Sequence, residues 1–160
     1  MLKQVELLEQ FEELAQWYAA LTGSEQGWRT PIGEGKWCPA EVVAHLVKWD
    51  EYLLTTVLPA ASSTIGQVEF PDHDTYNAVS LVYARSGISA AELLQEACKT
   101  RADLVQELRN LTEEQLFRAI PVNGHTHCPQ TNTPYSLGYL IWEFIQHDGH
   151  HRKQVEASIR

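Results

Sequence analysis

The chain has 160 residues, of which 44% are hydrophobic and 21% charged, and its formal net charge is −9. This composition suits a single domain over residues 1–160 with a hydrophobic core, and it excludes a disordered chain. The negative charge disfavours nucleic acid as a partner, and since no run of about 18 apolar residues occurs, we expect no membrane-spanning segment.

The first half of the chain predicts two long amphipathic helices. In residues 2–21, apolar side chains recur at alternating spacings of four and three, and Gly23 follows the last of them. The second helix is predicted over residues 39–58. Pro39 suits its first position, and Pro59 is expected to end it.

The second half predicts two more long helices. Ser89 and Glu92 form a capping box before an apolar stripe over residues 90–110, and a second capping box at Thr112 predicts a short extra turn. The fourth helix is predicted over residues 134–158, with Thr133 as its cap and Pro134 at its first position.

The connections decide the architecture. Residues 60–88 are too long for a tight turn, so they form a crossover that lets the second and third helices run parallel, and residues 76–85 form a short helix within it. The strand signals at residues 66–70 and 119–122 are weak, and these segments either pair or are loop. The sequence therefore predicts an all-α fold, a four-helix bundle with a long crossover between helices 2 and 3.

Three histidines are predicted to meet inside this bundle. His147 and His151 are four residues apart, so their side chains lie one above the other on a helix, in phase with the apolar stripe. His45 lies on the apolar face of the second helix, between Val42 and Trp49. Buried imidazoles need polar partners, and one shared divalent cation supplies them all. The alternative is that each ring is an ordinary hydrogen-bonded core residue.

A shell of three neutral nitrogen ligands leaves one position open for water or a thiolate. Such a set fits zinc, nickel, iron or copper, and intrinsic affinity does not choose among these metals. A divalent ion lowers the pKa of either bound ligand and so raises the fraction of nucleophile at neutral pH.

Other polar residues near these histidines are open to two interpretations. His150 points about 60° away from His147, which favours a surface position or an indirect role. Asp148 and Glu143 either orient a ligand by accepting an imidazole N–H or are solvated acids. Gly149 marks either a close helix approach or room for a ligand.

A second cluster of metal-binding residue types lies in the loop that leads into the fourth helix. It contains His125, His127 and Cys128 between Gly124 and Pro129. This spacing matches neither a CxxC knuckle nor an HxxxH helix pair, so an exposed loop is favoured over a metal site. Because the loop leads directly into the fourth helix, a position at the border of the pocket is the further prediction. The large aromatic side chains near the histidines are expected to be core residues, with a pocket lining as the alternative. These are Trp37, Trp49 and Trp142.

Two stretches together resemble the DinB/YfiT-like superfamily: WCPAEVVAHL at residues 37–46 and HDGHHRKQ at residues 147–154. The resemblance implies an up-down-down-up bundle, often dimeric, in which a histidine of helix 2 and an HxxxH pair of helix 4 bind a divalent metal. These positions correspond to His45, His147 and His151. The resemblance also implies a type of reaction. Relatives include thiol-dependent S-transferases and a thiol-dependent isomerase, in which the metal is thought to activate a low-molecular-weight thiol.

The leading hypothesis is a metalloenzyme, with zinc or nickel favoured, that acts on a small-molecule substrate. It activates a thiol such as bacillithiol or mycothiol, or a water, with S-transfer ranked first from the resemblance alone. The alternatives are a non-catalytic stress-response or small-molecule-binding module with a structural metal, and a metal-independent hydrolase of reactive natural products.

Location and assembly are expectations of the same kind. Residues 1–10 lack the basic start, apolar centre and cleavage site of a signal peptide. Cys38, Cys98 and Cys128 are far apart and odd in number, which argues against a disulfide framework. We therefore expect a cytoplasmic protein without nucleic-acid or membrane partners, and the family resemblance implies a homodimer.

Overall fold

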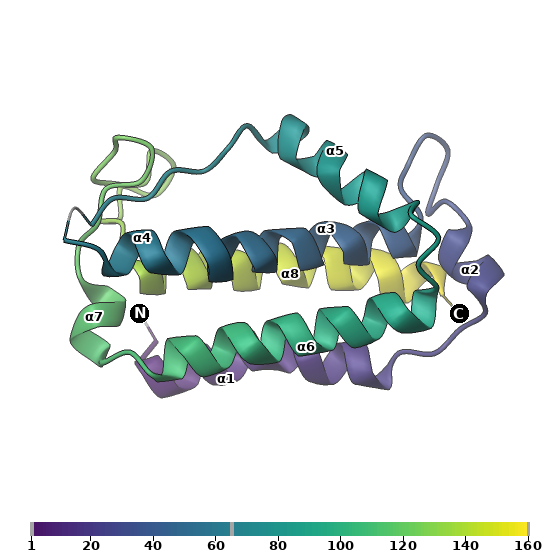
Figure 1. Ribbon diagram of the computed structural model, residues 1–160, viewed down its shortest axis with the longest axis horizontal. Coiled ribbons are helices and arrows are strands. Elements are labelled where there is room, and N and C mark those ends of the chain that lie inside the picture. Colours follow the sequence, from purple (N-terminus) through teal and green to yellow (C-terminus); the bar gives the residue numbers. More distant parts are fainter. Residues whose placement is uncertain (1, 65, 160) are drawn as a thin grey trace.

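Four long helical rods lie side by side along the length of the molecule (Figure 1). The structure is a computed structural model that describes residues 2–64 and 66–159. The elements in chain order are α1 (Gln4–Ala20), α2 (Glu25–Arg29), α3 (Pro39–Tyr52), the π-helical turn η1 (Leu53–Val57), α4 (Leu58–Ser62), α5 (His73–Ala84), α6 (Ala90–Arg109), α7 (Glu113–Phe117) and α8 (Leu137–Ser158). The first rod is α1, and the second is the continuous run of α3, η1 and α4. The third and fourth rods are α6 and α8, so the predicted all-α four-helix bundle is confirmed.

Two of the predicted helix starts are confirmed by their caps. The hydroxyl of Ser89 accepts the N–H of Glu92 at 3.1 Å, and α6 begins at the next residue. The hydroxyl of Thr112 accepts the N–H of Gln115 at 3.1 Å, and the short helix α7 follows it. Both capping boxes therefore act where the sequence places them.

The predicted end of the second helix at Pro59 is wrong. The chain stays helical to Ser62, because the π-helical turn η1 precedes the proline. The N–H of Leu58 bonds to the carbonyl of Leu53, five residues back. This wider turn changes the register at the point where a proline ring would clash with the preceding turn, and Pro59 then lies in the first turn of α4.

The predicted start of the fourth helix at Pro134 is also wrong. The cap is Ser136, whose hydroxyl accepts the N–H of Tyr139 at 3.0 Å. The preceding residues are extended, because the carbonyl of Tyr135 accepts the N–H of Ile120 at 3.0 Å and Pro134 pairs with His127. Pairing with the loop before it therefore overrides the helix signal.

The crossover contains the expected short helix, α5, which packs along α3 (Figure 1). It starts at His73 rather than at residue 76, because the carboxylate of Asp72 accepts the N–H of Thr75 at 3.0 Å. In Figure 1, α3 and α6 run in the same direction, as a long crossover predicts. The weak strand segments pair through an isolated bridge between Val68 and Val122.

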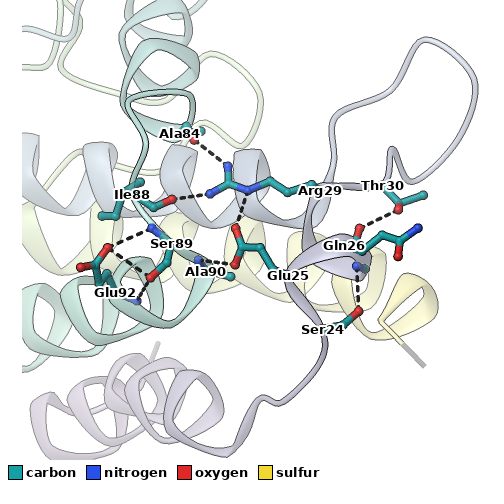
Figure 2. Close-up of polar contacts among 11 residues, drawn as sticks. Ser24, Glu25, Gln26, Arg29, Thr30, Ala84, Ile88, Ser89, Ala90 and Glu92 are labelled. Atoms are coloured by element: carbon teal, nitrogen blue, oxygen red, sulfur yellow. Dashed lines mark hydrogen bonds and ion pairs between the residues drawn. The ribbon is translucent and has the colours of Figure 1, made fainter.

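The short helix α2, absent from the sequence prediction, closes the far end of the crossover (Figure 2). Arg29 donates to the carbonyl of Ala84 at 2.6 Å and to that of Ile88, and Glu25 accepts the N–H of Ala90 at 2.9 Å. These contacts fix the C-terminal end of α5 and the first turn of α6 against the rest of the bundle.

A buried charge network crosses the middle of the bundle. Arg101 of α6 is fully buried and donates to both carboxylate oxygens of Asp50 on α3 at 2.8 Å, and to Asp148 on α8 at 2.9 Å. It also donates to the carbonyl of Phe11 at 2.9 Å, so one cation contacts all four rods. Among residues 2–64 and 66–159, no helix is long and apolar enough to cross a membrane.

Candidate metal centre

Three imidazoles meet between α3, α8 and the crossover. The Nε2 atom of His147 lies 3.2 Å from Nε2 of His45 and 3.1 Å from Nε2 of His151. One ring nitrogen from each residue lies within 4.8 Å of the other two. The structure thus brings together the three residues that the helical phase predicts, His45 from one rod and the HxxxH pair from another.

The opposite ring nitrogens have different surroundings. The Nδ1 atom of His45 lies 3.0 Å from Oδ1 of Asn77, and Nδ1 of His151 lies 2.7 Å from Oε1 of Gln154. By contrast, Nδ1 of His147 is buried and has no hydrogen-bond partner among the described residues. Two of the three rings are therefore oriented from behind by amide side chains.

Burial keeps these rings neutral. Desolvation, reinforced by neighbouring histidines, lowers the pKa of His45 to about 4 and that of His147 to about 3. The pKa of His151 is also lowered, again chiefly by burial. At neutral pH each ring therefore keeps an unprotonated nitrogen, which is the form that binds a metal.

These residues fit a divalent cation. Two nitrogen ligands of a tetrahedral zinc ion, each about 2.0–2.1 Å from the metal, lie about 3.3 Å apart. The Nε2 separations of 3.2 and 3.1 Å are close to that value. The donor set, three imidazole nitrogens, suits zinc, nickel, copper and iron.

The three histidines line a pocket with a volume of about 690 Å³. Its apolar wall includes Trp37, Trp49, Phe70 and Phe144, of which the last three have ring centroids 6.2–6.5 Å apart. Of the three tryptophans considered from the sequence, Trp37 and Trp49 therefore line a pocket. Trp142 instead stacks on Tyr139 and is not among the lining residues.

The acidic residues near the histidines have separate roles. Asp148 does not orient a ring but is buried against Arg101. Glu143 lines the pocket one helical turn before His147, and its carboxylate accepts a hydrogen bond from the Cys128 thiol at 3.6 Å. His150 is exposed, with its ring centroid 5.2 Å from that of His151, as a surface position predicts.

The loop cluster forms no second metal site among the described residues, since their one group of potential ligands is the histidine triad. His125 is exposed and lines the pocket, and His127 is exposed outside it. Cys128 is buried and donates to Gln130 at 3.1 Å, and a hydrogen bond with Tyr139 lowers the pKa of its thiol. The prediction that this loop borders the pocket is confirmed.

Two residues of the site escaped the sequence analysis. Gln154 is three residues after His151, so helical spacing could have suggested it. Asn77 is 32 residues from His45 and belongs to the crossover, and no spacing rule connects the two. Its role follows only from the way α5 packs on α3.

Comparison with known proteins agrees with this architecture. The sequence model of the DinB superfamily matches residues 6–155, whereas no curated protein matches. Among solved structures, YfiT from Bacillus subtilis superposes with a TM-score of 0.70 at 18% identity, over 97% of this chain and 85% of that one. YfiT is described as a probable metal-dependent hydrolase with an unusual four-helix bundle topology. Because the family match spans nearly the whole length, this chain belongs to the DinB superfamily.

Proposed function

We propose that this protein is a metal-dependent enzyme in which His45, His147 and His151 hold one divalent ion, zinc or nickel, and a small nucleophile reacts in the adjoining pocket. The observation that carries the proposal is the convergence of three neutral imidazole nitrogens at the pocket wall. Three protein ligands leave the open position that catalytic sites keep and structural zinc sites fill. When bound, the ion would lower the pKa of a water or a thiol.

The pocket residues would divide the remaining work. Trp49, Phe70 and Phe144 form a wall that excludes water and packs against an apolar or aromatic part of a substrate. Glu143 provides a carboxylate in the same pocket, which can accept a proton from the attacking nucleophile. None of the described lining residues is Lys or Arg, so the protein itself supplies no fixed positive charge there.

Two observations favour water as the nucleophile. Glu143 lies in the pocket as a candidate general base, and YfiT, which shares the fold, is described as a probable metal-dependent hydrolase. Thiol transfer is the second candidate, because a pocket of about 690 Å³ has room for a low-molecular-weight thiol beside an electrophile. A cytoplasmic location and a homodimer remain predictions from the sequence.

Metal loading tests the site directly. Dialysed protein loaded with zinc or nickel should retain about one equivalent, and His147→Ala should retain almost none, because two imidazoles make a poor site. The matched control is His150→Ala on the exposed side of the same helix, which should load normally. Wild-type protein with under about a tenth of an equivalent, or His147→Ala with normal loading, would reject the site.

Turnover then separates the candidate functions. Loaded protein is assayed against activated esters and amides, and against electrophiles mixed with bacillithiol or mycothiol. Metal-dependent hydrolysis that falls in Glu143→Gln supports the first candidate, whereas reaction that requires the thiol supports the second. A metal that raises only the melting temperature would indicate a binding module, and activity that survives chelation would indicate a metal-independent hydrolase.

A further inference from the structure

The crossover contributes one side chain, Asn77, that contacts a histidine of the site. Asn77 of α5 is half-buried at the pocket wall, and its Oδ1 atom lies 3.0 Å from Nδ1 of His45 and 3.1 Å from Nε1 of Trp49. The indole N–H of Trp49 can only donate a hydrogen bond. The Asn77 atom between the two rings must therefore be the amide oxygen, which can only accept.

This assignment determines the tautomer of His45. Since the oxygen of Asn77 accepts, Nδ1 of His45 carries the hydrogen, and in the neutral ring Nε2 carries the lone pair. That lone pair is on the nitrogen that faces Nε2 of His147 at 3.2 Å. The amide thus selects the one neutral form of His45 that can offer Nε2 to a cation.

The two other rings lack such a constraint. Gln154 contacts His151 at 2.7 Å, but no second donor fixes which amide atom faces the ring, and Nδ1 of His147 has no partner among the described residues. His45 is therefore the ring whose tautomer the protein determines.

The position of Asn77 is itself well supported. Tyr76 beside it donates to the carbonyl of Lys48 at 2.7 Å and packs on Trp49 with ring centroids 4.5 Å apart. The ion pair of Arg85 with Glu41 at 2.7 Å and the contacts of Arg29 (Figure 2) hold the C-terminal end of α5. The crossover is thus held against α3 at both ends of the stretch that contains Asn77.

We propose that Asn77 is a positioning residue that holds His45 as the Nδ1–H tautomer with Nε2 free, so that the crossover helix α5 is part of the metal centre. This inference rests on the proposed function, because it assigns a purpose to the lone pair on His45. It concerns a residue of the crossover that neither helical spacing nor the histidine motif indicates.

Two substitutions of Asn77 separate positioning from packing. Asn77→Leu keeps the branched side-chain shape but removes the acceptor, and it should weaken zinc binding by about 10–100-fold, the usual effect of losing such a partner. Asn77→Asp keeps an oxygen that accepts from both rings, so it should bind zinc as tightly as the wild type or more tightly. Ser80→Ala is the control within α5, because it removes a hydrogen bond to the backbone carbonyl of Asn77 and leaves the side-chain amide in place. It should leave zinc affinity unchanged.

Zinc affinity is measured by competition with a chromophoric chelator, and the tautomer by imidazole ¹⁵N shifts of metal-free protein at neutral pH. Wild type and Asn77→Asp should show His45 protonated at Nδ1, and Asn77→Leu should show a mixture of tautomers. Equal loss of affinity in both variants, or an unchanged His45 tautomer in Asn77→Leu, would overturn the proposal. If the wild type binds no zinc, the proposed function fails, and the ¹⁵N shifts still decide the role of Asn77.

Discussion

Two glycines of α8 differ in what a methyl group would meet. A Cβ at Gly138 would lie 2.3 Å from the ring of Phe117, whereas a Cβ at Gly149 would have nothing within 4 Å. Gly138 is therefore required by the packing of α7 on α8. Gly149 does not mark a close helix approach, so the first of the two interpretations drawn from the sequence is wrong.

This contrast predicts stability changes of opposite sign. Gly138→Ala should lower the free energy of unfolding by about 1–3 kcal/mol, because Phe117 must move from its packed position. Gly149→Ala should raise it by about 0.5–1 kcal/mol through helix propensity alone. Urea unfolding measures both, and equal effects of the two substitutions would show that Phe117 yields freely.

Glu41 lies in the first turn of α3, the helix that positions His45. Its carboxylate accepts the N–H of Cys38 at 3.1 Å and pairs with Arg85 at 2.7 Å. Burial alone would raise the pKa of Glu41, but its contacts with Cys38 and Arg85 outweigh burial and lower it. The ionised form therefore stabilises the folded protein.

The sign of this shift predicts a pH dependence. Above the ordinary pKa of 4.5 the Glu41 carboxylate is ionised in both the folded and the unfolded state, so its full contribution to the free energy of unfolding is present. As the pH falls below that value the unfolded chain takes up the proton first, and the contribution is lost. Glu41→Gln, which keeps a capping acceptor, should cost about 0.5–1 kcal/mol at pH 7. Chemical unfolding at pH 7 and near pH 3 should show that the difference in unfolding free energy between the wild type and Glu41→Gln is smaller at pH 3. An equal difference at both pH values would contradict a stabilising role of the ionised Glu41.

At the scale of elements, Arg101 connects the rods. It lies on α6 and pairs with one carboxylate on α3 and another on α8, and all three side chains are buried. A buried ion pair is not in itself stabilising, but removing one partner leaves an uncompensated charge inside the protein. The placement of α3 relative to α8, the two helices that carry the histidines, therefore depends on Arg101 of α6.

Arg101→Met should lower the free energy of unfolding by about 3–5 kcal/mol, because Asp50 and Asp148 remain buried without their cation. The combined substitution Asp50→Asn, Arg101→Met and Asp148→Asn should recover part of the loss. Lys99→Met on the same helix removes the exposed pair with Asp103 and should have no measurable effect. Thermal and urea unfolding compare the three variants with the wild type, and a mild effect of Arg101→Met would show that the cluster is hydrated rather than buried.

At the scale of the whole molecule, the proposed metal would link α3 to α8. A ligand that binds only the folded state stabilises it by mass action, by about 2.7 kcal/mol at 100 times its dissociation constant. Zinc should therefore raise the melting temperature of the wild type and not of His147→Ala, and a chelator should reverse the rise. Differential scanning fluorimetry at increasing zinc concentration measures this, and an equal rise in both proteins would place the binding elsewhere.

The sequence by itself determined the class of fold, the four long helices and the face on which three histidines lie. These properties depend on local capping and on a periodicity of 3.6 residues, which can be read along one chain segment at a time. His45, His147 and His151 could be assigned to one interior because each continues an apolar stripe.

Only the tertiary structure decided where two of the helices end or begin and what surrounds the histidines. Pro59 stays helical because of a π-helical turn, and Pro134 is extended because the loop before it pairs with that segment. Asn77 reaches His45 from 32 residues away because α5 lies along α3. Contacts of this kind depend on how separate elements pack together, and no local pattern in the sequence specifies that packing.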